Sequence, residues 1–351
     1  GTAIQNRNIT GIKEFSSFIP NLFMPDYGSK LTSPVYIRGI GSKINAPSVG
    51  LYVDGIPYFE KSAFDFDFNE VDRIEVLRGP QGTLYGRNTM GGIINVYTKS
   101  PLKYEGTNVW LSNGSYGYRD YALSHYKKIG EKFGYAISGD YRNSDGYFTN
   151  LFTDKKADDM KSGSARIRLE WKPQKNLSFG LMSSFDRSVQ GGYPYAVCDS
   201  VTHKPGEVDY NDYSFYKRTL STTGFSADYQ GTGYSINSRT AFQYLSDHQG
   251  IDQDFSPRSI YFARQDMKQK MFFRRAEHQI DDSRTLQMAV RRLRFLAEDR
   301  QHRDTRLFHQ RLCDTQAVRH AGLWCRLLPP IHNRRPADAR PVTDFRHPLR
   351  L

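Results

Sequence analysis

The sequence predicts a membrane β-barrel wall that follows a small α+β domain, and three observations lead to this fold class. Segments of about ten residues with apolar residues at every second position follow one another from residue 107, and a tilted strand of that length can cross a bilayer. The connections between these segments alternate between short and long, as in outer-membrane barrels. Aromatic residues make up 14% of the chain, which suits rows of aromatic side chains at both membrane interfaces.

Length and composition narrow the choice of function. The 351 residues suffice for one large domain or two ordinary ones, and we find no run of about 18 apolar residues that would form a membrane helix. The net charge of +12 owes much to an Arg-rich segment after Leu286, so we expect no nucleic-acid partner. The spacing of Cys198, Cys313 and Cys325 matches no zinc or disulfide pattern, and we expect no cofactor and no metal site. By composition alone, a soluble all-β domain remains an equal alternative.

The first hundred residues carry the signals of a compact domain. Residues 35–39 and 49–53 alternate as strands, and Asp54-Gly55 after the second is a hairpin-turn signal. An amphipathic helix is expected to end at Pro20. Asp65 and Asp67 alternate with phenylalanines, but no His or Cys stands nearby, so we expect no catalytic role for them.

A Gly-rich connection between two short strand patterns dominates this domain. The strands are expected at residues 73–77 and 92–98, with Ile74 and Val76 on one face of the first. Glycines permit positive φ and close backbone approach, so the connection is expected to be tightly folded. The glycines concerned are Gly79, Gly82, Gly86, Gly91 and Gly92.

Three motifs in this region resemble the plug domain of TonB-dependent outer-membrane receptors. They are VYIRGIGS at residues 35–42, SVGLYVDGIPY at 48–58 and VDRIEVLRGPQGTLYGRNTMGGIINVYTK at 71–99. The resemblance is strong over residues 4–100 and continues as a barrel pattern to about residue 273. It implies an N-terminal α+β plug inside a barrel that has 22 strands in the family. The expected domains are residues 1–102 (plug), 103–273 (N-terminal barrel strands) and 274–351 (an anomalous Arg-, His- and Pro-rich tail).

The resemblance also implies a function. The expected activity is TonB-dependent active transport of a scarce, bulky nutrient, most often an iron–siderophore chelate, across the Gram-negative outer membrane. The implied partners are the TonB–ExbB–ExbD energy-coupling complex, outer-membrane lipid and a small-molecule or chelate substrate, and the chain is not expected to be an enzyme. A passive porin or surface adhesin, and a soluble all-β carbohydrate-binding protein, remain as alternatives.

Site residues follow from the same resemblance. Plug charges are expected to face the barrel wall and to pair with charges there, because desolvated ion pairs make a weakly cohesive contact that suits a movable part. Solvated surface charge is the alternative. Besides Arg87, the plug-motif and contact residues are Arg38, Gly39, Asp54, Gly55, Arg73, Glu75, Arg78, Gly79, Gly82, Tyr85, Gly86, Gly91 and Gly92.

The barrel pattern separates strands from loops. Residues 133–141 and 165–171 are the clearest alternating strands, and long polar connections are expected at 143–161, 188–216 and 246–257. Aromatic side chains in the loop of residues 188–216 could contact a chelate or a sugar, or could pack the loop itself. These candidate ligand residues are Tyr193, Tyr195, His203, Tyr210 and Tyr213.

The chain is expected to be an incomplete and inactive copy of such a receptor. The strand pattern stops at about Phe273, and the codons possible around Met288 allow a shifted reading frame that restores aromatic residues and glycines. About eight strands precede this point, too few to enclose a plug, so an open, curved sheet is expected. The opening residues show no apolar leader, and the TonB box and signal peptide are expected to lie outside this chain.

Overall fold

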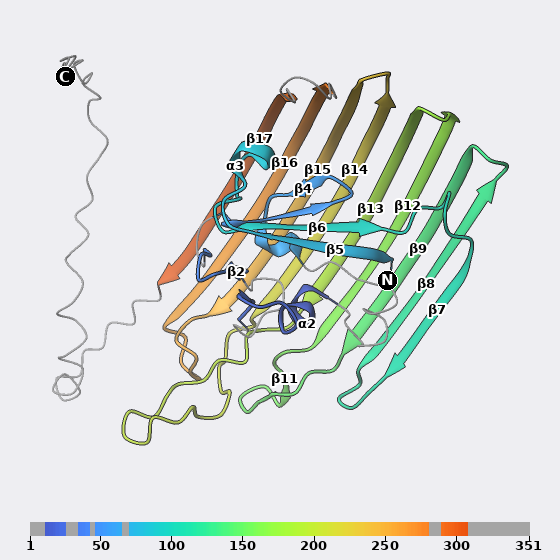
Figure 1. The fold of residues 1–351 in the computed structure, drawn as a ribbon. Helices are drawn as coiled ribbons and strands as arrows, with labels where there is room; N and C mark the ends of the chain where they lie inside the picture. The colour runs from blue at the N-terminus through green and yellow to red at the C-terminus, as the bar shows by residue number, and fades with distance from the viewer. Residues whose placement is uncertain (1–10, 26–33, 43–45, 65–69, 281–288, 308–351) are drawn as a thin grey trace, which may run out of the picture. The chain divides into compact units, whose positions relative to one another are not determined.

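The computed structural model contains an N-terminal domain and a long antiparallel sheet, here called the wall (Figure 1). It describes residues 11–25, 34–42, 46–64, 70–280 and 289–307. All of these belong to one compact unit, Gly1–Phe308. Asp65 and Asp67 lie outside the described residues.

The N-terminal domain is built around a mixed four-stranded sheet with strand order β4-β3-β6-β5. β3 pairs in parallel with β6, and β5 pairs antiparallel with β6. Leu51, Val53, Ile94 and Val96 of the two central strands are at most 1% exposed and form the core. The elements are α2 (Ile12–Ser16), β1 (Leu22–Phe23), β2 (Tyr36–Ile37), β3 (Val49–Val53), β4 (Ile56–Tyr58), the 3-10 helix η2 (Lys61–Phe64), β5 (Val71–Arg78), α3 (Gly82–Tyr85) and β6 (Gly92–Thr98).

The hairpin turn predicted at Asp54-Gly55 joins β3 to β4. Val53 and Ile56 are paired, and the two turn residues have φ angles of 49° and 81°. Two successive positive φ angles define the turn that matches strand twist, and Asp followed by Gly adopts them at low cost. The segment at residues 35–39 is shorter than expected, because Arg38 and Gly39 form a turn with φ angles of 51° and 78°.

The glycine-rich connection folds back tightly, as expected. The Gly79 amide donates to the Gly91 carbonyl at 3.0 Å, which closes the connection between β5 and β6. Gly92 has φ 141°, and a β-carbon there would lie 2.3 Å from the Leu77 carbonyl oxygen. Only glycine fits this position, because the conformation is unfavourable for other residues and the space is filled by backbone.

The wall is an open nine-stranded meander in the described residues, with β7 and β17 at its edges (Figure 1). Its strands have from 8 to 20 residues, so most exceed the ten expected. β10 (Thr149–Asn150) and β11 (Lys155–Lys156) form a separate hairpin between β9 and β12. The wall strands are β7 (Gly106–Asn113), β8 (Arg119–Ile129), β9 (Phe133–Ser144), β12 (Met160–Gln174), β13 (Leu177–Gln190), β14 (Phe215–Gln230), β15 (Tyr234–Asp252), β16 (Tyr261–Ile280) and β17 (Ala289–Leu307).

Two strand boundaries differ from the sequence expectation. The long loop expected at residues 246–257 is strand as far as Asp252, because side chains such as Asp247 (8% exposed) are buried against the N-terminal domain and need not reach solvent. The strand pattern also continues past Phe273, since β16 ends at Ile280 and β17 pairs with it. Hydrogen bonds between strand backbones do not require alternating apolar side chains, so the sequence pattern did not reveal that the strands continue past Phe273. Residues 281–288 and 308–351 lie outside the described residues.

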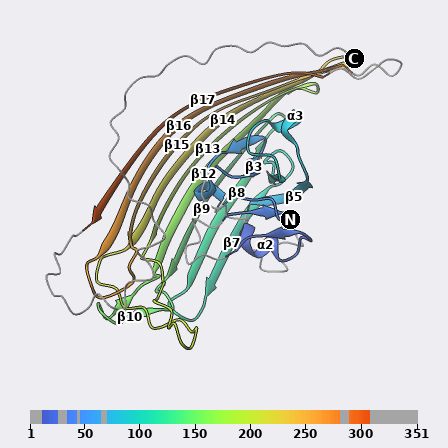
Figure 2. The same cartoon turned by 90° about the vertical axis from the view of Figure 1, so that its left-hand side faces the viewer.

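The connections divide by length between the two ends of the wall. Residues 130–132, 175–176 and 231–233 are short turns, as predicted, and this end is called the short-turn end. Residues 145–159, 191–214 and 253–260 are longer and define the long-loop end. The N-terminal domain lies against the concave face of the curved sheet (Figure 2).

The wall exposes apolar side chains on one face and buries polar side chains on the other, which is the reverse of a soluble protein. Leu111, Ile137 and Ile167 on the convex face are 48% to 70% exposed, whereas Arg218 and Thr222 on the concave face are at most 1% exposed. An apolar exposed face opposite a polar buried one is typical of a membrane barrel. No helix in the described residues is long and apolar enough to span a membrane.

Candidate functional site

The candidate site is the joint between the N-terminal domain and the wall, and Arg168 of β12 is at its centre. Its guanidinium donates to the Asp54 carboxylate at 3.0 Å and to the Thr98 carbonyl at 3.2 Å. It also bonds Glu170 of its own strand, with a closest N–O distance of 2.6 Å, and Glu170 accepts a hydrogen bond from Ser100. One wall side chain therefore holds the β3–β4 turn, the end of β6 and the linker that follows.

The geometry of Asp54 is set by its own domain. The Thr98 amide and hydroxyl donate to its two carboxylate oxygens at 3.0 and 2.7 Å. The turn conformation points the carboxylate at the end of β6. Contacts within the N-terminal domain alone therefore orient the acceptor that binds Arg168. The pair is mostly buried, with side-chain exposures of 20% for Arg168 and 16% for Asp54.

Two further polar contacts join the N-terminal domain to the wall. Arg166, two residues before Arg168, pairs with Glu70 at 2.9 Å, and both side chains are about 14% exposed or less. Gln269 of β16 donates to Glu60 at 3.1 Å. Because successive inward residues of a strand lie two positions apart, Arg166 and Arg168 face the N-terminal domain together.

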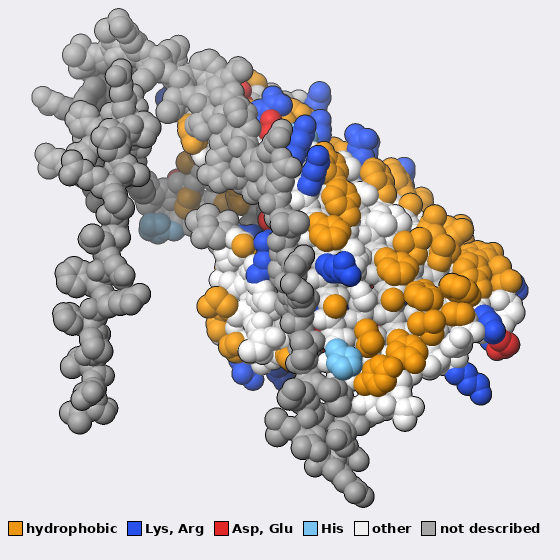
Figure 3. Space-filling model, turned by 90° about the horizontal axis from the view of Figure 1, so that it is seen from above, with side chains coloured by type: hydrophobic (Ala, Val, Ile, Leu, Met, Phe, Trp, Pro, Cys, Tyr) orange, Lys and Arg blue, Asp and Glu red, His pale blue; other side chains and the backbone are white. Residues whose placement is uncertain are grey.

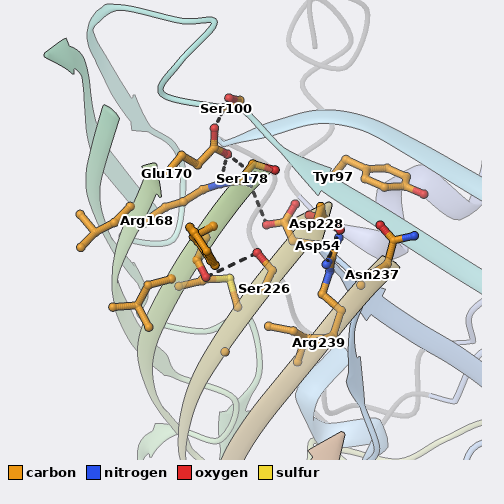
Figure 4. A pocket seen from close by; sticks show the side chains of 18 of the residues that line it. Asp54, Tyr97, Ser100, Arg168, Glu170, Ser178, Ser226, Asp228, Asn237 and Arg239 are labelled. Atoms are coloured by element: carbon orange, nitrogen blue, oxygen red, sulfur yellow. Dashed lines mark hydrogen bonds and ion pairs between the residues drawn. The ribbon is translucent and has the colours of Figure 1, made fainter. Parts of the chain in front are cut away.

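A cavity of about 660 Å³ lies next to the Arg168 cluster, between β6 and the wall strands (Figure 4). Its charged lining is locally neutralised: Arg239 pairs with Asp228 at 2.7 Å, and Arg275 donates to Glu277 at 2.7 Å. Such a lining is polar without a strong net field of one sign.

An aromatic pair of the N-terminal domain completes this side of the joint. Tyr52 and Tyr85 meet edge to face at 5.0 Å, and the Tyr52 hydroxyl donates to the Tyr85 carbonyl at 2.7 Å. Burial raises the pKa of Tyr52, so its hydroxyl stays protonated and remains a donor even in alkaline solution. The Arg275 guanidinium of the wall lies 5.1 Å from the centre of the Tyr85 ring.

The structure brings some of the predicted contact residues to the wall. Asp54 pairs with Arg168, a β-carbon on Gly55 would meet Arg239 at 3.5 Å, and Tyr85 lies beside Arg275. These three come from the turn and the helix that the motifs mark.

Other predicted charges have their described contacts within the N-terminal domain. Arg73 pairs with Glu75 at 3.0 Å, and Arg78 donates to the Pro20 carbonyl at 3.3 Å. Arg87 lies over the ring of Phe59 at 4.4 Å. Their pairing with a barrel wall therefore stays a prediction.

The remaining predicted residues have backbone roles in the N-terminal domain. Arg38 and Gly39 form the turn after β2, Gly82 and Gly86 bound helix α3, and Gly79, Gly91 and Gly92 close the connection described above.

Sequence reasoning missed Glu70, Arg166 and Arg168 as site residues. The signal was present in part, since residues 165–171 predict a strand with its charged side chains on one face. Arginines at successive inward positions of a strand are buried at low cost only where anionic side chains of the enclosed domain pair with them.

The loop aromatics are divided between packing and exposure. Tyr193 (5% exposed) donates to Gln249 at 3.2 Å, and Tyr210 (4% exposed) packs with Val208. Tyr195 is 37% exposed and Tyr213 is 72% exposed. His203 lies in an exposed turn of the same loop. Tyr195 stacks on Tyr193 at 5.8 Å, and Tyr213 stacks on Phe215 at 5.6 Å. Ligand contact by these loop residues stays a prediction.

The fold and the joint define a class: a curved antiparallel wall with an N-terminal domain docked on its concave face, the fold that solved outer-membrane receptors share. Residues 1–93 match the family model of the TonB-dependent Receptor Plug Domain, and this domain is called the plug below. The Pesticin receptor of Yersinia pestis is 36% identical over 100 residues, 28% of this chain and 15% of that protein. Vitamin B12 transporter BtuB of Vibrio cholerae is 36% identical over 103 residues, 28% of this chain and 16% of that protein.

Solved structures share the fold over a longer part of the chain. The ferric yersiniabactin uptake receptor FyuA of Yersinia pestis matches with a TM-score of 0.76 and 19% identity, over 88% of this chain and 49% of that chain. Ferric citrate transporter FecA matches with a TM-score of 0.68 and 12% identity, over 86% and 47%. The chain therefore spans about half the length of these receptors.

Proposed function

We propose that the chain is part of a receptor that takes up a scarce, bulky ligand across the outer membrane, powered through TonB with ExbB and ExbD. The observation that supports it best is the joint at Arg168. Charged and hydrogen-bonded contacts connect the plug to the wall there, beside a polar cavity. Apolar side chains also meet across the joint, with Ile56 and Phe59 of the plug packed against wall residues such as Phe273. The charged contacts can be exchanged for water at a smaller free-energy cost than this apolar packing, which suits a plug that has to move.

An iron–siderophore chelate is the substrate class that we propose. Relatives that share the fold include receptors titled for ferric yersiniabactin and for pyoverdine, while BtuB carries vitamin B12. Tyr213, which is 72% exposed and stacks on Phe215, offers an aromatic surface to such a ligand.

We further propose that the 351-residue chain alone does not transport. Its nine described wall strands form an open sheet, and a sheet with two edges does not enclose the plug. The division between plug and wall at residue 102, and a shifted reading frame in the tail, belong to the same proposal, whereas the boundary expected at residue 273 lies inside β16. Mass spectrometry of peptides from residues 291–351 tests the reading frame directly.

Growth rescue tests the function. A full-length form of the gene, with an intact reading frame, is expressed in a siderophore-deficient strain and supplied with candidate chelates. Growth that requires TonB and is lost with Arg168→Met is the expected result. Growth that persists without TonB would refute energy-coupled uptake and favour a passive porin.

A further inference from the structure

We propose that the short-turn end of the wall carries a lysine belt that binds anionic phospholipid headgroups. The belt is formed by Lys127, Lys132 and Lys175, which are all exposed. This is an interaction surface separate from the plug joint, and it does not depend on transport.

The charge of the wall differs between its two ends. Three segments at the short-turn end, residues 103–105, 127–132 and 172–175, hold six lysines and two glutamates. The long connections at residues 145–159, 191–214 and 253–260 hold nine acidic residues against four lysines and arginines. The two ends therefore present opposite signs to the surroundings, and the positive end suits an anionic partner.

The belt lies at the level where lipid headgroups meet the wall. Lys132 directly precedes Phe133, which is paired in register with Trp171, and Trp171 is 50% exposed. The Trp171 ring stacks on Phe179 at 5.5 Å, so an aromatic row follows this edge of the apolar face. Aromatic rows mark the membrane interface, and lysines just beyond them extend their amines to the phosphates.

Lys127 links the belt to the lipid-facing surface itself. It is on the same side of β8 as Leu123 and Ile129, which are 54% and 55% exposed. Its ammonium is 4.0 Å from Glu105, and its side chain is 56% exposed, so this weak pair leaves it accessible. The view onto the short-turn end shows Lys and Arg side chains beside the apolar surface (Figure 3).

A membrane surface is favoured over a soluble acidic partner because the cations follow the aromatic row around the wall. Anionic lipids attract a juxtamembrane group of lysines, and each cation adds to the attraction. Lys103, Lys128 and Lys172 add to the positive charge of this end, but they line the cavity and are not part of the belt.

Fluorescence quenching tests the belt locally, because Trp171 lies beside it. The chain, with Trp110→Phe and Trp324→Phe, is inserted into phosphatidylcholine vesicles that contain a minority of either brominated phosphatidylglycerol or brominated phosphatidylcholine. Phosphatidylglycerol is expected to be enriched at Trp171 roughly threefold, and high salt should remove the preference.

The decisive comparison uses two triple variants. Lys127→Gln/Lys132→Gln/Lys175→Gln should abolish the preference, whereas Lys155→Gln/Lys156→Gln/Lys204→Gln at the long-loop end should retain it. A preference that survives the first variant, or is lost equally in the second, overturns the proposal. If the first variant does not insert, the test uses the unaltered chain. Absence of a preference for phosphatidylglycerol at Trp171, or a preference that high salt does not reduce, then contradicts the belt. Loss of the preference on adding inorganic phosphate, with the ionic strength held constant, would overturn the assignment to lipid.

Discussion

Replacing Arg168 with Met should loosen the plug at the end of β6. The change removes the cation shared by Asp54 and Glu170, which are both 16% exposed, and leaves two carboxylates without it. Removing one partner of a buried pair costs about 3–5 kcal/mol. Asp54 keeps its two bonds from Thr98, and Glu170 keeps Ser100. We therefore expect the lower end, about 3 kcal/mol.

Hydrogen exchange of the β6 amides measures this loss. When exchange reports the opening equilibrium, about 3 kcal/mol corresponds to roughly a hundredfold faster exchange at the end of β6. Arg239→Met is the matched control, because the ion pair of Arg239 is with Asp228 of the wall and methionine keeps the stem that lies beside Gly55. The control should leave β6 exchange unchanged.

A double-mutant cycle separates the Asp54 contact from the rest. Asp54→Asn keeps the turn, since Asn tolerates a φ of 49°, and should cost less than the arginine change. The pair should show a coupling free energy of about 1–2 kcal/mol. Unaltered β6 exchange in Arg168→Met, or an equal effect of Arg239→Met, would refute the assignment of Arg168 as the residue that holds the plug.

Three further changes test other parts of the structure. Gly92→Ala should destabilise the plug by at least about 2 kcal/mol in urea unfolding, because the new methyl group meets a backbone carbonyl. Gly79→Ala, where the methyl group has open space around it, should cost about 1 kcal/mol. Equal costs would contradict the clash at Gly92. Ile167→Arg should lower stability in vesicles by about 2–4 kcal/mol, as expected for a lipid-facing position, and Tyr213→Arg in the exposed loop should have little effect; a tolerated Ile167→Arg would argue against lipid contact. Burial, and then a neighbouring carboxylate, raise the pKa of Asp212. Its contribution to loop stability is therefore present below pH 3.8 and is lost as the pH rises through the higher folded-state pKa. Asp212→Asn should flatten this pH dependence in limited proteolysis with an acid-active protease, and an unchanged profile would count against the shift.

Much of the plug could be predicted because its signals are local. The Asp54-Gly55 turn and the glycines around Gly92 depend on φ angles that few residues adopt, so sequence identity and backbone shape correspond directly. The alternation of residues 165–171 likewise predicted a wall strand with a polar inward face.

The partners across the joint could not be predicted in the same way. Asp54 and Arg168 are 114 residues apart, and their meeting depends on how two separately folded parts dock. Sequence indicated which side chains faced inward, but not that Arg73 and Glu75 would pair with each other while Glu70 reached Arg166. Strand ends were also uncertain, because polar residues such as Asp247 are equally common in loops and on a buried polar face.

The position of β6 has a mechanical consequence for the N-terminal domain. This strand is central in its sheet, hydrogen-bonded to β3 on one side and β5 on the other, and it leads directly into the linker to β7. A force that pulls β6 along its own axis from the linker acts on its hydrogen bonds to β3 and to β5 at the same time. These bonds must therefore break together. The four-stranded sheet should therefore yield as one cooperative body, and it should resist being peeled away strand by strand.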